Sequence, residues 1–132
     1  MSAKQEWINT AIEAMEKAYV PYSKFPVGAA LITESGEVFQ GCNIENASFG
    51  LTNCAERTAF FKAVSEGNMS FSHLVVAGET EDPISPCGAC RQVMVEFCSP
   101  DMPVSLVNTK GDIKETTVSE LLPYSFESDQ MG

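Results

Sequence analysis

Apolar residues recur at helical spacing in three stretches of the chain. The first stretch runs roughly from Lys4 to Tyr19 and stops before Pro21, which cannot continue a helix. The second runs from Cys54 to Glu66 and is followed by Gly67, a common helix-ending residue. The third runs from Gly88 to Cys98. We therefore predict three helices, of which the second and third begin beside cysteines.

Shorter apolar runs between these helices predict strands. Residues 27–33 and 37–43 flank a turn at 34–36 and predict an antiparallel hairpin. Three further strands are predicted at 74–78, 104–108 and 113–116. The segment Thr117-Val118-Ser119-Glu120 has the pattern of a capping box and predicts a short final helix.

The predicted order is α-β-β-α-β-α-β-β-α, which contains β-α-β-α-β. Such a unit favours right-handed crossovers, parallel central strands and helices on both faces of the sheet. The predicted fold class is α/β, a three-layer α/β/α sandwich around a mixed five-stranded sheet. No repeat or linker interrupts the chain, so residues 1–132 are expected to form a single domain, with a short polar tail from about residue 123.

Charge narrows the choice of partners. The chain has 8 Lys and Arg against 18 Asp and Glu, a net charge of −10, and its basic residues are scattered. This composition disfavours nucleic acid and anionic membranes, and no Gly-rich phosphate loop is present, so a small uncharged substrate is expected. No apolar run approaches the roughly 20 residues of a membrane span, and no signal peptide is evident. A cytoplasmic protein is therefore expected.

Five cysteines without an export signal argue for free thiols rather than disulfides. Three of them, Cys54, Cys87 and Cys90, lie at predicted helix N-termini, where partial positive charge and free N–H groups stabilise thiolates. Cys87 and Cys90 are three residues apart and share one face of a first turn, and Cys54 can add a third sulfur. Three thiolates without an obvious fourth ligand suggest zinc with one open position for water, as in catalytic sites.

Glu56 indicates which reaction such a zinc site could catalyse. A carboxylate two residues from a metal ligand can accept a proton from water and deliver it elsewhere, which points to hydrolysis. A Cys-x-x-Cys pair alone is more often structural or redox-active, but the redox interpretation leaves Cys54 and Glu56 without a role. A closed structural site would need a fourth ligand from His73, Cys42 or Cys98. A non-catalytic zinc module that binds a partner is the rival interpretation.

Five segments carry a resemblance to a known family. They are P-Y-S-K-F-P-V-G-A-A at 21–30, G-C-N-I-E-N-A-S at 41–48, N-C-A-E-R-T-A at 53–59, S-P-C-G-A-C-R-Q at 85–92 and E-L-L-P at 120–123. Over about residues 19–122 the chain resembles the small zinc-dependent cytidine deaminases of pyrimidine salvage. The resemblance implies hydrolytic deamination of cytidine and 2′-deoxycytidine to the uridines plus ammonia. It also implies one Zn²⁺ per chain on Cys54, Cys87 and Cys90, with Glu56 as proton shuttle.

The resemblance further implies four substrate contacts. Asn43 and Glu45 would hold ribose hydroxyls, Phe25 would form an aromatic wall for the pyrimidine, and Ala55 would present its backbone to the base. Asn43 and Glu45 are two apart on an extended segment, so they are expected to face the same way. Without the resemblance, Asn-x-Glu at a strand end is more often plain surface, and a lone phenylalanine is more often core.

Three thiolates and Zn²⁺ sum to a charge of −1, which activates water poorly unless it is offset. Arg57 follows Glu56 and Arg91 follows Cys90, and these are the only two arginines of the chain. An arginine that donates to a zinc-bound sulfur would withdraw electron density, and the resemblance favours this role for Arg57. Surface pairing is the alternative for both arginines, and the role of Arg91 stays open.

Phe49 stands where many relatives have tyrosine, so any hydrogen bond of that hydroxyl is lost here. Blasticidin deaminases share the zinc motifs and a similar length, but the combination of Phe25, Asn43 and Glu45 points to an ordinary nucleoside. The three-thiolate members of the family are homotetramers with sites near subunit boundaries, so a homotetramer is expected.

Overall fold

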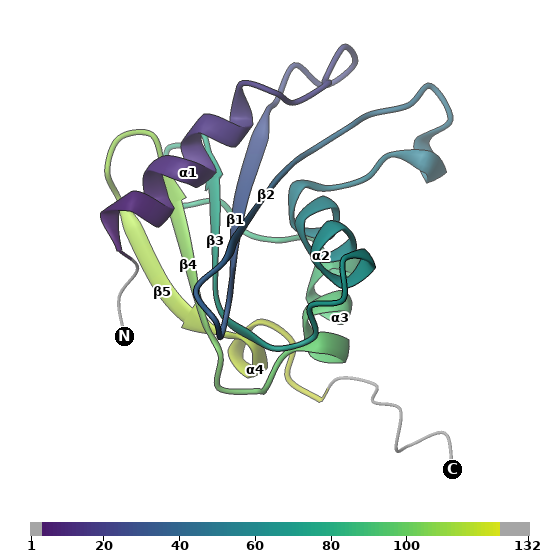
Figure 1. Ribbon diagram of the computed structural model, residues 1–132. Helices are drawn as coiled ribbons and strands as arrows, with labels where there is room; N and C mark the ends of the chain where they lie inside the picture. Colours follow the sequence, from purple (N-terminus) through teal and green to yellow (C-terminus); the bar gives the residue numbers. More distant parts are fainter. Residues whose placement is uncertain (1–3, 125–132) are drawn as a thin grey trace.

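The computed structural model describes residues 4–124, so most of the tail predicted from about residue 123 lies outside the described residues. One sheet with the order β2-β1-β3-β4-β5 forms the middle layer. Its strands are β1 (Val27–Thr33), β2 (Val38–Cys42), β3 (Phe71–Gly78), β4 (Pro103–Asn108) and β5 (Ile113–Thr117). The helices are α1 (Gln5–Met15), α2 (Ala55–Ser65), α3 (Gly88–Phe97) and α4 (Val118–Leu121), with a 3-10 turn η1 (Phe49–Leu51). Figure 1 shows α1 on one face and α2 and α3 on the other, which confirms the three-layer sandwich.

Strand directions differ in part from the prediction. β2, β3 and β4 run the same way, as a β-α-β-α-β unit requires, but only β3 and β4 pair as parallel neighbours. β1 lies between β2 and β3 and is antiparallel to both. The hairpin explains the difference, because its first strand occupies the edge of β2 against which β3 would otherwise pair. The connection through α2 therefore passes over β1.

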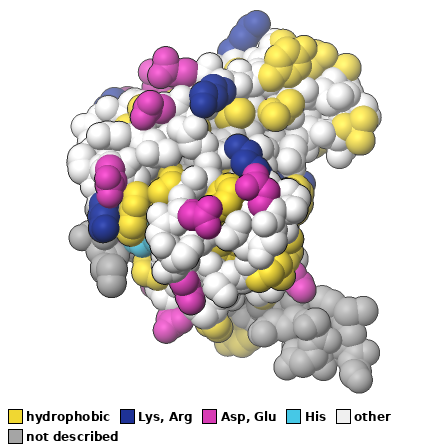
Figure 2. Space-filling model, in the orientation of Figure 1, with side chains coloured by type: hydrophobic (Ala, Val, Ile, Leu, Met, Phe, Trp, Pro, Cys, Tyr) yellow, Lys and Arg dark blue, Asp and Glu magenta, His cyan; other side chains and the backbone are white. Residues whose placement is uncertain are grey.

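Two loops extend beyond the sheet at the end where α2 begins. One follows α1, and the other follows β2 and contains η1; both lie at the upper right of Figure 1. Hydrophobic side chains gather over this region in Figure 2. The exposed large hydrophobic residues of the two loops are Tyr19, Tyr22, Phe25, Ile44, Phe49 and Leu51.

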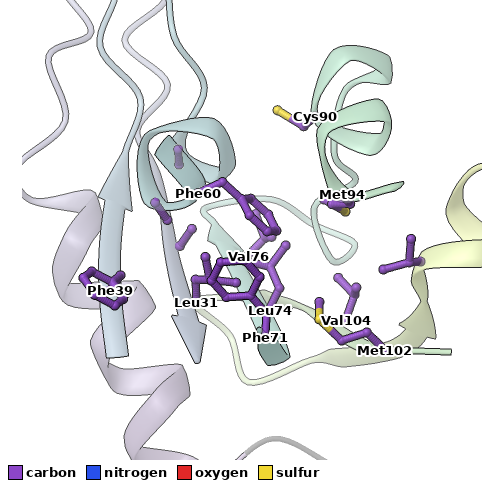
Figure 3. Close-up of a cluster of buried hydrophobic side chains, with 14 of the residues drawn as sticks. Leu31, Phe39, Phe60, Phe71, Leu74, Val76, Cys90, Met94, Met102 and Val104 are labelled. Carbon is purple, nitrogen blue, oxygen red and sulfur yellow. The ribbon is translucent and has the colours of Figure 1, made fainter. Parts of the chain in front are cut away.

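Residues on the two faces of the sheet pack into two hydrophobic clusters. On the face covered by α2 and α3, Leu31, Leu74 and Val104 meet Phe60 and Met94, as Figure 3 shows. On the other face, α1 covers a smaller cluster that contains Ile32, Val75 and Val107. Every residue of β1 is buried because both helix layers cover it.

Helix α1 ends at Met15, four residues before the predicted end at Tyr19. The backbone of Tyr19 pairs with the segment after β2 instead: its N–H donates to the Asn43 carbonyl at 3.0 Å, and its carbonyl accepts from the Glu45 N–H at 2.8 Å. β3 begins at Phe71, three residues before the prediction, because Phe71 and His73 continue the ladder with β1. The first of these changes brings the loop after α1 against residues 43–45.

Two glycines allow the helices to approach the sheet closely. A Cβ at Gly41 of β2 would lie 2.2 Å from the Ala55 carbonyl oxygen and 2.7 Å from the Ala59 nitrogen, both in α2. A Cβ at Gly28 of β1 would lie 1.9 Å from the Ala11 carbonyl oxygen in α1. Gly41 thus sets where the first turn of α2 lies.

No helix within residues 4–124 is long and apolar enough to cross a bilayer.

Candidate metal centre and active site

Three cysteine sulfurs meet at the N-termini of α2 and α3. Cys54 is the N-cap of α2, Cys87 is the N-cap of α3, and Cys90 lies in the first turn of α3. The Cys87 Sγ is 3.6 Å from the Cys54 Sγ and 3.3 Å from the Cys90 Sγ, and all three sulfurs lie within 4.8 Å of one another. Within residues 4–124, no other group of three or more His, Cys, Asp and Glu side chains is arranged to hold a metal ion.

The spacing of these sulfurs fits one zinc ion. Tetrahedral zinc with Zn–S bonds of about 2.3 Å separates its sulfur ligands by about 3.8 Å, close to the observed distances. None of the described cysteines forms a disulfide. Three sulfurs fill three of the four positions, and no described His, Asp or Glu side chain belongs to the cluster. The donor set is therefore that of a zinc site with one position left for water or substrate.

Hydrogen bonds around the sulfurs favour the thiolate form. Arg57 Nη2 donates to the Cys54 Sγ at 3.2 Å, and the backbone N–H of Cys90 donates to the Cys87 Sγ at 3.4 Å. A hydrogen bond from the Cys90 thiol, helped by Arg57, lowers the pKa of Cys54 to about 5. The same contact with Cys54, together with burial, raises the pKa of Cys90. These contacts stabilise a thiolate at Cys54, and binding of a cation to all three sulfurs displaces the remaining thiol protons.

Glu56 lies in the first turn of α2, and its side chain is 4% exposed. Burial raises the pKa of this carboxyl to about 7. A carboxyl that gains and loses a proton near neutral pH is suited to general acid–base chemistry.

A cleft of about 190 Å³ opens beside the sulfurs. It is lined by Phe25, Val27, Asn43, Cys54, Ala55, Glu56, Ile84, Ser85 and Cys87. Six of these residues are candidate site residues from the sequence. The other three were missed. Val27 and Ile84 are apolar residues at the end of a strand and in a loop, and Ser85 is a single serine in a loop, so none of them carries a chemical signature in the sequence.

Asn43 and Glu45 both face the loop before β1, but they line different hollows. Asn43 Nδ2 donates to the Phe25 carbonyl at 2.9 Å, and its Oδ1 accepts from the Val27 N–H at 2.9 Å. Glu45 Oε1 accepts from the backbone N–H groups of Tyr22 and Ser23, each at 3.1 Å, and Oε2 accepts from the Ser23 hydroxyl. Glu45 does not line the cleft beside the sulfurs. It lines a second hollow of about 420 Å³ with Tyr22, Ser23, Asn46, Ala47, Phe49 and Thr52.

The two arginines make different contacts. Arg57 binds the Cys54 sulfur, and its Nε is the one buried side-chain nitrogen or oxygen without a hydrogen-bond partner in the described part of the chain. Arg91 donates to the Pro86 carbonyl at 2.9 Å, the Leu121 carbonyl at 2.7 Å and the Ser85 Oγ at 2.7 Å. Arg91 therefore ties the segment before α3 to α4 through neutral oxygens.

Three further residues considered as ligands lie outside the cluster. His73 is buried against the Trp7 ring, with ring centroids 5.2 Å apart, and its Nε2 lies 2.8 Å from the Ser105 Oγ. Burial lowers the pKa of His73. Cys98 packs against the larger hydrophobic cluster, where burial raises its pKa to about 12, and Cys42 lines a separate hollow of about 60 Å³.

The sandwich and its site define a zinc-binding domain with a buried acid–base carboxyl beside a small cleft. Residues 1–106 match the family described as the cytidine and deoxycytidylate deaminase zinc-binding region, and the chain belongs to this family. It is 63% identical over 120 residues to a cytidine deaminase of Sporosarcina psychrophila, covering 91% of this chain and 88% of that protein. It is 58% identical over 129 residues to that of Halalkalibacterium halodurans, covering 98% of each. A crystal structure of cytidine deaminase from Burkholderia pseudomallei superposes with a TM-score of 0.91 at 53% identity, over 95% of this chain and all of that one.

Proposed function

We propose that the chain catalyses the hydrolytic deamination of cytidine and 2′-deoxycytidine to uridine and 2′-deoxyuridine, with release of ammonia, in pyrimidine salvage. The observation that carries the proposal is the position of Glu56, a buried carboxyl that lines the same cleft as Cys54 and Cys87. Membership of the deaminase family and the high identity to cytidine deaminases support it.

Cys54, Cys87 and Cys90 would hold the zinc ion, which would supply the Lewis acidity that makes water a nucleophile near neutral pH. Glu56 takes a proton from the attacking water and gives it to the ring nitrogen of the pyrimidine. The hydroxide adds to the ring carbon that bears the amine. Glu56 then moves the proton of the added hydroxyl to the amine and the carbon–nitrogen bond breaks, so that cytidine and water become uridine and ammonia. The burial of Glu56 keeps bulk water from competing for these protons.

The cleft provides contacts for the nucleoside. Phe25 forms one wall against the pyrimidine, and Ala55 presents its backbone to the base beside the sulfurs. Asn43, which lines this cleft, and Glu45, which lines the second hollow, bind ribose hydroxyls. Glu45→Ala should therefore weaken the use of cytidine strongly, and free cytosine should be a poor substrate. Turnover of cytosine as fast as cytidine would contradict these ribose roles.

Arg57 offsets the charge of the centre. Three thiolates and Zn²⁺ leave a charge of −1, and the guanidinium that donates to the Cys54 sulfur draws electron density from it. The partnerless Nε leaves a further donor on the same side chain.

The partners of the chain are further copies of itself, and together they form a homotetramer. Phe49 is 88% exposed and Leu51 is 70% exposed, and Tyr19, Tyr22 and Ile44 are further exposed hydrophobic residues of the two loops. Figure 2 shows several hydrophobic groups over this region, at its upper right. Exposed apolar residues that gather over one region commonly mark interfaces between proteins. Sedimentation equilibrium should give four times the mass of one chain, and a monomer at micromolar concentration would contradict the assembly.

One experiment tests the enzymatic function. The fall in ultraviolet absorbance on cytidine deamination is followed together with the zinc content per chain. We expect turnover of both cytidine and 2′-deoxycytidine at one zinc per chain. Bound zinc without turnover of any pyrimidine nucleoside would instead favour a non-catalytic zinc module.

A further inference from the structure

We propose that Ser23 is a positioning residue of the nucleoside site, whose hydroxyl connects the Glu45 carboxylate to the aromatic wall formed by Phe25. The proposal rests on the function proposed above and adds to it a residue that the family resemblance does not assign. Its basis is that the Ser23 hydroxyl has two partners. It donates to Glu45 Oε2 and accepts from the Phe25 backbone N–H at 3.1 Å.

The hydrogen bonds of Glu45 show what this hydroxyl fixes. An ionised carboxylate has about four acceptor sites, two on each oxygen. The backbone N–H groups of Tyr22 and Ser23 occupy Oε1, and the Ser23 hydroxyl takes one site on Oε2. One acceptor site on Oε2 is left for a hydroxyl of the sugar. Ser23 therefore sets both the orientation of the carboxylate and the direction of its remaining acceptor.

The backbone around Ser23 depends on the same contacts. Lys24, between Ser23 and Phe25, has φ of +59°, a left-handed conformation that non-glycine residues seldom adopt. Hydrogen bonds hold the chain on both sides of it: Ser23 binds Glu45, and Asn43 binds the Phe25 carbonyl and the Val27 N–H. The strained turn is thus fixed by side chains from the segment after β2, and it presents Phe25 to the cleft.

Removal of the hydroxyl should weaken binding more than chemistry. Without it, Glu45 keeps only its backbone donors, and the Phe25 N–H loses its acceptor. The sugar contact and the aromatic wall are then both less well oriented. Cys54 and Glu56 lie at the start of a different element, α2, and Ser23 makes no hydrogen bond to them. KM for cytidine should therefore rise while kcat stays close to the parent value.

The kinetic test compares three variants with the parent. Ser23→Ala removes the hydroxyl, and Ser23→Thr keeps it. Ser65→Ala removes a similarly exposed hydroxyl that donates to the Lys62 carbonyl near the far end of α2. We expect Ser23→Ala to raise KM about tenfold, the size expected for one hydrogen bond to a charged group, with kcat within about twofold. Ser23→Thr and Ser65→Ala should stay near the parent in both constants. A fall in kcat at unchanged KM, or a threonine variant as impaired as the alanine variant, would overturn the proposal.

A second measurement needs no substrate. The hydrogen bond from Ser23, with those from the backbone, holds the pKa of Glu45 below its ordinary value. Carboxyl ¹³C NMR titration should show this pKa rising in Ser23→Ala and unchanged in Ser65→Ala. An unchanged Glu45 titration in Ser23→Ala would overturn the proposed connection. If the parent does not deaminate cytidine, the proposed function fails, but the titration still decides whether Ser23 holds Glu45.

Discussion

Replacing Gly41 by alanine tests how strictly the site depends on the contact between β2 and α2. The new Cβ would lie 2.2 Å from the Ala55 carbonyl oxygen and 2.7 Å from the Ala59 nitrogen. Since non-bonded atoms need about 3.4 Å or more, the first turn of α2 must move away by roughly 1 Å. Cys54 and Glu56 lie at this turn, so both should move with it.

The expected losses follow from that displacement. Forcing extra volume into a packed interior costs about 1–3 kcal/mol of stability. A shift of about 1 Å in a reacting group can reduce turnover about 100-fold. It would also change the distance between the Cys54 and Cys87 sulfurs, now 3.6 Å, and lower the affinity for zinc. We therefore expect Gly41→Ala to lose stability, zinc affinity and turnover together.

The assay measures these three quantities separately. Urea denaturation gives stability, competition with a chromophoric chelator gives zinc affinity, and absorbance gives cytidine turnover. Gly28→Ala is the matched control, because its Cβ would lie 1.9 Å from the Ala11 carbonyl oxygen, in a helix that carries no site residue. The control should lose similar stability but keep its zinc affinity within about threefold. The reasoning is refuted if Gly41→Ala loses stability and still binds zinc and turns over cytidine like the parent.

Three further outcomes are expected. Glu56→Gln should keep zinc and fold but lose about 10²–10⁴-fold in turnover, because an amide cannot carry the proton; parental turnover with zinc bound would exclude the role. Arg57→Ala should bind less zinc, turn over slowly and need higher pH, whereas Arg57→Gln, which still donates, should be milder; an unchanged pH–rate profile in Arg57→Ala would mean that the charge is offset elsewhere. In the folded chain, burial holds the pKa of His73 below its ordinary value of 6.5. As pH drops below that value the unfolded chain binds the proton more readily, so the free energy of unfolding should fall. Urea denaturation at several pH values should show a shallower fall in His73→Gln, and equal slopes would contradict the assignment.

Local patterns predicted the layers of the fold well. The N-termini of α2 and α3 agree with the sequence to within one residue, because capping and turn residues act locally. The position of β1 between β2 and β3 was not predicted, since strand order depends on which edge a hairpin leaves free. The early end of α1 was missed for a similar reason: Tyr19 pairs with residues 43–45, more than 20 positions away in the chain.

The candidate site divides in the same way. The family resemblance and the cysteine spacing predicted a sulfur cluster, and the structure brings the sulfurs of Cys54, Cys87 and Cys90 together. Glu56 lines the same cleft as two of them, Cys54 and Cys87. The sequence did not show that Glu45 lies outside this cleft, held by the backbone of Tyr22 and Ser23. Its partners are mostly main-chain N–H groups, which every residue except proline carries and which therefore leave no trace in a sequence.

The positions of Cys54 and Cys87 also give the metal a part in the stability of the chain. These ligands are 33 residues apart, and the central strand β3 lies between them. One ion bound to both closes a loop of the chain that contains β3, and closing a loop of this length removes roughly 3–4 kcal/mol of conformational entropy from the unfolded state. Most residues of the hydrophobic clusters on both faces of the sheet are not metal ligands. A chelator should therefore leave the sheet folded but lower its resistance to heat, so that the ion serves as a removable crosslink as well as a reagent.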